Sequence, residues 1–134
     1  MSFLESAKRT IALESQAVAG LLAQLDAQFS NACQLCLECT GRVVVTGMGK
    51  SGHIGQKIAA TLSSTGTPAF FMHPAEASHG DLGMLTQNDV VLALSNSGSS
   101  SEIMTLIPLM KRLGTPLICV TGDPNSVMAE AADV

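Results

Sequence analysis

Four short apolar runs divide most of the chain, at 43–47, 69–72, 90–94 and 117–121. They consist mainly of Val, Ile, Leu, Phe and Ala with little polar alternation, which is typical of strands buried on both faces of a parallel sheet. Helical patterns lie between or after them, at roughly 53–64, 101–113 and 125–132, and Gly66 and Gly114 follow the first two of these helices. The alternation predicts a doubly wound α/β fold in which helices sandwich a parallel sheet.

A longer helical pattern precedes the first strand. Its apolar positions keep to one face of a helix: Leu4, Ala7, Ile11, Val18, Leu22, Leu25 and Phe29. If unbroken, this opening helix has about seven turns. Its apolar stripe can pack on the chain's own sheet or on a second subunit, and the sequence leaves both open.

Three cysteines follow at every third position, Cys33, Cys36 and Cys39. An iron–sulfur run needs a fourth cysteine followed by proline, and Thr40 and Gly41 stand there instead. We therefore expect a short helix from near Ser30 to Gly41, free thiols and no metal site.

Composition narrows the classes of function. The chain has 134 residues, of which 46% are hydrophobic and 13% charged, and a net charge of −4. This length suits one domain, and the negative charge argues against nucleic acid as a partner. We expect no membrane span and no signal peptide, hence a cytoplasmic protein. We assign residues 1–134 to one domain, and the strand-like pattern of 131–134 indicates that it is incomplete at the C-terminus.

Two predicted strands end in Gly- and Ser-rich loops, Gly47–His53 and Ser95–Glu102, and a helical pattern follows each loop. Carboxyl ends of parallel strands meet at one edge of a sheet, where ligands of such folds bind. Hydroxyls, backbone N–H groups and helix N-termini at that edge suit a phosphate. The expected side-chain donors are Ser51, Ser95, Asn96, Ser97 and Ser100.

Three familiar motifs near these loops are incomplete. Residues 47–52 fit the Gly-x-Gly-x-x-Gly dinucleotide fingerprint, but the second strand ends at His73 instead of an acidic residue. Residues 49–51 suggest a nucleotide P-loop, yet Val44 stands where its first glycine belongs. Ser97 lacks the glycine two positions earlier that a nucleophile elbow requires. These mismatches favour a phosphate ester that is not a nucleotide.

Several segments together resemble one family: Gly47–Gly55, Ser63–Pro68, His73–Glu76, His79–Gly83 and Ser95–Gly98. They are similar to the sugar isomerase (SIS) domain of D-arabinose-5-phosphate isomerases, and the similarity runs over essentially the whole chain. The resemblance implies an aldose–ketose isomerase that interconverts D-ribulose 5-phosphate and D-arabinose 5-phosphate through an enediol(ate). In the family this reaction supplies the 3-deoxy-octulosonate precursor of lipopolysaccharide, or serves capsule or sugar-alcohol pathways.

The resemblance also implies residue roles. The serines and the asparagine of the two loops match the family's phosphate contacts, and Lys50, His79 and Glu102 match polar residues around the sugar. We expect these three to be catalytic, with Glu102 as an acid or base, and rank His53 and His73 below them. Ser99 stands where several members carry Glu, and it forms a Ser-x-x-Glu pattern with Glu102. That pattern is typical of a helix capping box, so a structural role for Glu102 stays open.

The resemblance further implies a homo-oligomer, a tetramer, whose only other partner is a small sugar phosphate. It implies no metal or organic cofactor, and further sheet residues and usually a pair of CBS domains after position 134. Two alternatives remain: a phosphosugar-binding sensor without turnover, and an isomerase of a hexulose or heptulose phosphate. The segment His79–Gly83 disfavours the second, and the polar residues around the sugar disfavour the first.

Overall fold

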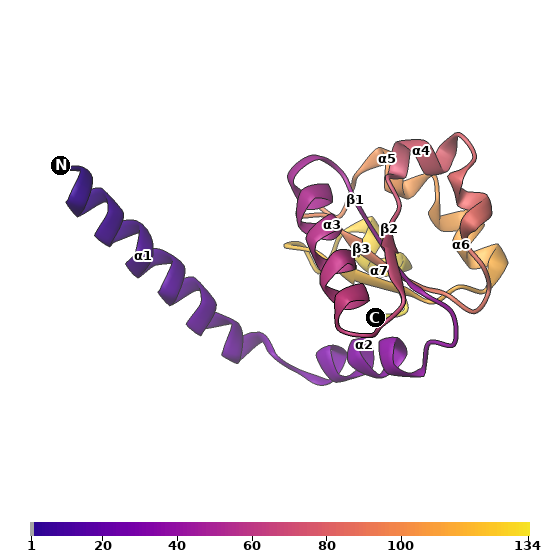
Figure 1. The fold of residues 1–134 in the computed structure, drawn as a ribbon, viewed down its shortest axis with the longest axis horizontal. Helices are drawn as coiled ribbons and strands as arrows, with labels where there is room; N and C mark the ends of the chain where they lie inside the picture. The colour runs from indigo at the N-terminus through magenta and orange to yellow at the C-terminus, as the bar shows by residue number, and fades with distance from the viewer. Residues whose placement is uncertain (1) are drawn as a thin grey trace. The chain divides into compact units, whose positions relative to one another are not determined.

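The computed structural model describes residues 2–134 and divides the chain into two units (Figure 1). The first unit ends at Asn31 and the second covers Ala32–Val134.

The N-terminal unit contains the helix α1 (Phe3–Gly20) and a short 3-10 helix η1 (Leu21–Gln24). A capping box starts α1: the Ser2 hydroxyl accepts the backbone N–H of Glu5 at 3.2 Å, and the Ser2 backbone N–H donates to the Glu5 carboxylate at 2.6 Å. These bonds from Ser2 hold the pKa of Glu5 below its usual value. The apolar side chains of the unit are exposed.

The predicted N-terminal helix is confirmed, but it does not run unbroken to Phe29. The backbone becomes extended at Leu25, and a new helix, α2 (Ala27–Glu38), begins after Asp26. The Asp26 carboxylate accepts the N–H groups of Gln28 at 2.8 Å and Phe29 at 3.4 Å. Because these side-chain bonds take N–H groups that a continuous helix would use itself, Asp26 starts a new helix. The cysteine-bearing helix therefore begins and ends about three residues earlier than expected.

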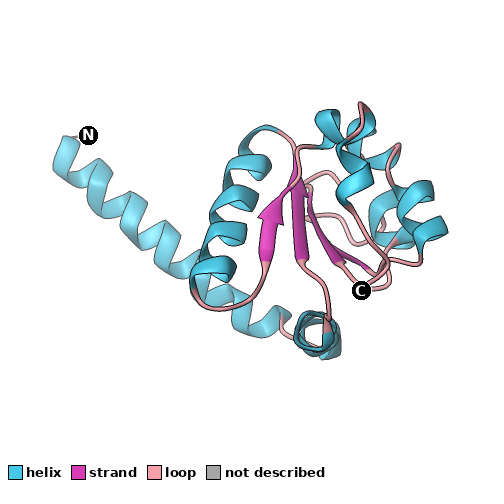
Figure 2. Ribbon diagram, turned by 45° about the vertical axis from the view of Figure 1, so that its right-hand side comes forward, coloured by secondary structure: helices cyan, strands magenta, loops and turns pink. Residues whose placement is uncertain are grey.

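The second unit is built on four parallel strands, β1 (Val43–Gly47), β2 (Ala69–Phe71), β3 (Val90–Leu94) and β4 (Leu117–Val120). Their order in the sheet is β2-β1-β3-β4. Figure 2 shows the strands lying between helices. Val45 of β1 is in register with Phe71 on one side and Leu92 on the other. The doubly wound parallel sheet predicted from the apolar runs is confirmed.

Helices cover both faces of this sheet. On one face, α3 (Gly49–Ser64) packs with Val43 and Val45 of β1, together with Cys36 of α2. On the other face, the core around Val44 is covered by α4 (Pro74–Ser78), η2 (Asp81–Met84), α5 (Ser101–Met104), α6 (Ile107–Leu113) and α7 (Val127–Ala131). Alternate residues of β1 thus enter different cores, as the strand geometry requires.

Two helix boundaries differ from the predicted ones, and both matter for the site. The helix expected at 53–64 already begins at Gly49, so Lys50 lies in its first turn. The helix expected at 101–113 is interrupted between Met104 and Ile107. Pro108 explains the interruption, because it has no N–H for the carbonyl of Met104 and its ring would clash with that carbonyl.

The amino end of the sheet is fixed by a buried ion pair. Asp89 is 1% exposed and lies 3.3 Å from Arg42, whose side chain is 38% exposed. The Asp89 carboxylate also accepts the backbone N–H groups of Arg42 and Thr86, each within 2.8 Å. The Arg42 guanidinium stacks over the ring of Phe70, 4.7 Å from its centroid. Beyond β4, Val134 pairs in parallel with the strand through N–H···O bonds to Leu117 and from Cys119.

Candidate active site

The first half of the site is the β1 loop (Met48–Ser51), which consists of Met48 and the first turn of α3. Met48 is the N-cap of α3 and makes no side-chain capping bond, so the N–H groups of the first turn stay available to a ligand. Gly52 fits closely against the end of β1, since a Cβ there would lie 2.7 Å from the Gly47 carbonyl oxygen. This contact brings the positive end of α3 to the carboxyl edge of the sheet.

The second half is the β3 loop (Ser95–Ser100). The buried Ser95 hydroxyl accepts the Gly98 N–H at 3.1 Å and lies 3.0 Å from the Ser100 hydroxyl. The Ser97 hydroxyl accepts both the N–H and the hydroxyl of Ser99, at 3.3 and 3.1 Å. Within residues 2–134, the N–H groups of Ser97 and Ser100 have no protein acceptor. The loop therefore combines hydroxyls that bond to one another with free backbone donors.

The two loops meet at a cavity of about 440 Å³ between the carboxyl ends of β1, β3 and β4. Four predicted phosphate or catalytic residues line it: Lys50, Ser51, Ser95 and Asn96. Ile54, Leu94 and Val120 form an apolar wall, and Thr121 and Gly122 complete the lining. Ligands of doubly wound sheets bind in such a crevice.

Thr121 and Gly122 were missed at the sequence level. Both residues follow β4. Ligands of such sheets bind at the carboxyl ends of the strands, so the same reasoning applied to the fourth strand would have found them. No Gly/Ser run marks that end.

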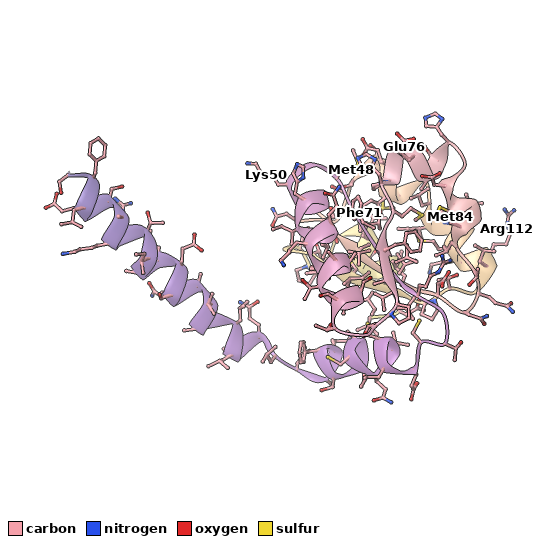
Figure 3. All side chains as sticks on the ribbon, viewed as in Figure 1. Met48, Lys50, Phe71, Glu76, Met84 and Arg112 are labelled. Atoms are coloured by element: carbon pink, nitrogen blue, oxygen red, sulfur yellow. The ribbon has the colours of Figure 1, made fainter. Side chains whose placement is uncertain are left out.

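The other predicted residues lie around the same edge but outside the cavity lining. Ser97 and Ser100 are on the β3 loop, Glu102 is in the first turn of α5, and His79 is exposed at the end of α4. Figure 3 shows Met48, Lys50 and Glu76 along this edge, Glu76 coming from α4. Four of the predicted residues therefore line one cavity, three others follow Ser95 on the β3 loop and α5, and His79 lies at the end of α4.

The predicted capping box of Ser99 and Glu102 is wrong. Ser100 is the N-cap of α5, and the Ser99 hydroxyl donates to Ser97 instead. The Glu102 carboxylate accepts the Ser101 hydroxyl at 3.0 Å. Because the N-cap lies one residue later than the box requires, Ser99 and Glu102 do not form a capping box.

The Glu102 carboxylate is held in its ionised form. A hydrogen bond from its own backbone N–H, a second from the Ser101 hydroxyl and the nearby charge of His73 together lower the pKa of Glu102. Glu102 is therefore ionised at neutral pH and able to accept a proton, although the lowered pKa makes it a weaker base than an ordinary glutamate.

His73 enters this group only through the tertiary structure. It follows β2 as the N-cap of α4, and its Nδ1 accepts the Ala75 N–H at 3.3 Å. In the neutral ring this bond leaves the proton on Nε2. The ring meets Phe71 edge-on, with centroids 6.4 Å apart. The sequence ranked His73 low because it precedes Pro74 in an expected extended turn. Its proximity to Glu102 arises from two distant segments of the chain.

In residues 2–134, no group of three or more His, Cys, Asp or Glu side chains is arranged for a metal ion. No helix in this range is both long and apolar enough to cross a membrane. The four cysteines are free thiols. Burial and the neighbouring thiols of Cys33 and Cys39 raise the pKa of Cys36.

A family model described as SIS domain matches residues 36–134. The chain belongs to the SIS domain family. This SIS domain is 65% identical over 134 residues to arabinose 5-phosphate isomerase KdsD of Pseudomonas aeruginosa and 58% identical over 132 residues to KdsD of Escherichia coli K12. The two alignments cover 100% and 98% of the present chain, but only 41% and 40% of the two relatives. The chain therefore spans about two fifths of the length of these curated relatives.

A solved structure agrees with this assignment. The SIS domain described here superposes on E. coli CFT073 c3406, solved in complex with arabinose 5-phosphate, with a TM-score of 0.93 and 40% identity. The match covers 100% of this chain and 73% of that one. The family and the fold inferred from the sequence segments are confirmed.

Proposed function

We propose that this SIS domain is the sugar-phosphate-binding and catalytic part of an isomerase that interconverts D-ribulose 5-phosphate and D-arabinose 5-phosphate. The observation that supports it most is the cavity between the two Gly/Ser loops, in a chain 65% identical to a curated arabinose 5-phosphate isomerase. Residues 1–134 act here as one functional segment of the longer protein.

The phosphate is bound between the β1 loop and the β3 loop. Ser51, Ser95 and Asn96 face the cavity, and Ser97 and Ser100 add backbone N–H groups from the same loop. On binding, the hydroxyls of Ser95 and Ser100 exchange their bond to each other for bonds to phosphate oxygens. Many neutral donors hold a dianion without burying several cations, and the phosphate fixes the sugar in register for the reaction.

The chemistry is a proton transfer between neighbouring carbons. Glu102, ionised at neutral pH, removes a proton from C1 of the ketose. This forms an enediolate, and return of a proton to C2 with transfer of the hydroxyl proton from O1 to O2 gives the aldose. Lys50 stabilises the negative oxygen or the phosphate, and the exposed His79 moves hydroxyl protons. The reaction requires no cofactor.

Isotope exchange tests this proposal. The protein is incubated with ribulose 5-phosphate in deuterated water, and arabinose 5-phosphate and its deuterium at C2 are measured. We expect deuterated product, a loss of turnover in Glu102→Gln, and weaker binding in Ser95→Ala and Ser97→Ala. Absence of turnover in the full-length protein, with the sugar phosphate still raising its melting temperature, would identify a binding module instead of an enzyme.

Self-association is a further part of the proposal. In the N-terminal unit, Phe3, Leu4, Ile11, Val18 and Leu22 are each at least 66% exposed. An apolar helix face of this kind is suited to a second copy of the chain, and a homotetramer is the state expected from the family resemblance. We also propose a cytoplasmic enzyme that supplies the lipopolysaccharide precursor pathway. Light scattering of the protein tests the tetramer.

A further inference from the structure

We propose that Ser126, with the β4–α7 segment (Thr121–Ser126) that carries it, is a positioning element that fixes the backbone of the β3 loop and thereby sets the affinity for the ligand's phosphate. The identity of the ligand rests on the proposed function, whereas the contact itself does not.

Two backbone carbonyls of the β3 loop accept hydrogen bonds from residues that follow β4. The Asn96 carbonyl accepts the N–H of Gly122 at 3.1 Å, and the Gly98 carbonyl accepts the N–H of Met128, in the first turn of α7, at 3.0 Å. The two segments are also closely packed, since a Cβ on Gly122 would lie 2.8 Å from Asn96 Oδ1. The β3 loop therefore lies against a partner from a different part of the chain.

Gly98 is the point of closest contact. Its φ is +60°, which favours glycine, and a Cβ there would overlap the Ser126 side chain and come within 2.9 Å of Thr121 Oγ1. Ser126 is 6% exposed and caps α7, its hydroxyl accepting the Ala129 N–H at 3.3 Å. Because the hydroxyl is engaged in this cap, Ser126 cannot turn aside without releasing the start of α7.

The contact between Gly98 and Ser126 affects the backbone N–H groups that would donate to a phosphate. The hydroxyls of the β3 loop bond to one another and rotate freely enough to change partners, but the direction of the N–H groups of Ser97 and Ser100 is set by the backbone. Gly98 lies between these two residues. A shift of the backbone at Gly98 misdirects both N–H groups together, so the Gly98–Ser126 contact controls phosphate affinity although Ser126 lies outside the cavity lining.

The test compares two glycines with similar backbone strain. Gly98→Ala is matched by Gly114→Ala, because Gly114 has a φ of +74° and an added Cβ meets nothing within 4 Å. Gly114 ends α6, away from the β3 loop in sequence and in hydrogen bonding. The double variant Gly98→Ala/Ser126→Gly removes the Ser126 atoms that the new Cβ would overlap and leaves Thr121 Oγ1, at the end of a rotatable side chain, 2.9 Å away. Glycine is itself an acceptable N-cap.

Two measurements are made on each variant. Calorimetry gives the affinity for arabinose 5-phosphate and for inorganic phosphate, and hydrogen exchange of the peptide over 95–101 is followed without ligand. We expect Gly98→Ala to weaken phosphate binding by about 10-fold or more, the equivalent of one charge-assisted hydrogen bond. It should also exchange faster at 95–101, whereas Gly114→Ala matches the wild type in both measurements and the double variant recovers most of the affinity.

Other outcomes overturn the proposal. Equal affinity of Gly98→Ala and Gly114→Ala would show that the contact does not set phosphate binding, and so would a double variant as weak as Gly98→Ala. If the wild type binds neither probe, the proposed function fails, and the exchange data alone decide: unchanged exchange at 95–101 in Gly98→Ala then refutes the positioning role.

Discussion

Asp89→Asn is expected to destabilise the fold by about 2–4 kcal/mol, although it changes one atom type. One carboxylate oxygen of Asp89 accepts the backbone N–H and the Nε of Arg42, and the other accepts Thr86 N–H, the Thr86 hydroxyl and Arg42 Nη2. In the Asp89→Asn variant, the amide nitrogen replaces one of these two oxygens and faces two N–H donors. The side chain is only 1% exposed, so water does not replace the lost acceptor. Each buried donor without an acceptor costs about 1–3 kcal/mol, so two such donors would cost about 2–6 kcal/mol. The Arg42 side chain is 38% exposed and its Nη2 also donates to the Met84 carbonyl, which limits the upper end to about 4 kcal/mol.

The pH dependence of this effect has a definite sign. Burial raises the pKa of Asp89, but the hydrogen bonds from Arg42 and Thr86 outweigh it, and the net shift is downward. A carboxylate with a lowered pKa in the folded state stabilises the protein above the unfolded pKa and loses this contribution as pH falls through the folded value. The difference between the wild type and Asp89→Asn should therefore be largest near neutral pH and shrink below about pH 4.

Urea denaturation followed by far-UV circular dichroism measures this, because the chain has no Trp or Tyr for fluorescence. With an unfolding slope of about 2 kcal/mol/M, the midpoint should fall by about 1–2 M at pH 7. Asp81→Asn is the matched control, since Asp81 is exposed and the same chemical change there should be nearly neutral. A loss of under about 0.5 kcal/mol, or a difference that is independent of pH, would refute the reasoning.

Three further outcomes follow from particular contacts. Gly41→Ala should destabilise the fold, because a Cβ would lie 2.5 Å from Asp89 Oδ1, and denaturation measures it. Gly20→Ala, in α1 with nothing within 4 Å, should instead raise helix content and stabilise α1 by about 0.5–1 kcal/mol; a loss of ellipticity would contradict this. Because the Ser101 hydroxyl lowers the pKa of Glu102, Ser101→Ala should move the acidic limb of the pH–rate profile to higher pH, and an unmoved limb would remove Glu102 as the titrating base.

Local patterns were sufficient where burial is uniform. The four strands are close to continuous apolar runs, so the local sequence pattern was enough to locate them. The helices between them indicated that the strands run parallel. The loops at their carboxyl ends were predicted for the same reason, because strand direction decides which loops share an edge.

Helix boundaries were less predictable because side-chain bonds compete with the helix backbone. Asp26 splits the opening helix, and Pro108 interrupts the one after the β3 loop. The Ser99–Glu102 capping box failed for a related reason, since the β3 loop turns one residue later and uses Ser100 as the N-cap.

The sequence by itself determined the α/β class, the parallel strands and the residues that gather at one edge of the sheet, because each depends on neighbours within a few positions. Only the tertiary structure decided that Thr121 completes the cavity, that His73 lies near Glu102 and that Ser126 packs against Gly98. Each of these joins segments from different strands of the sheet. Their proximity depends on strand order and packing, which no local pattern encodes.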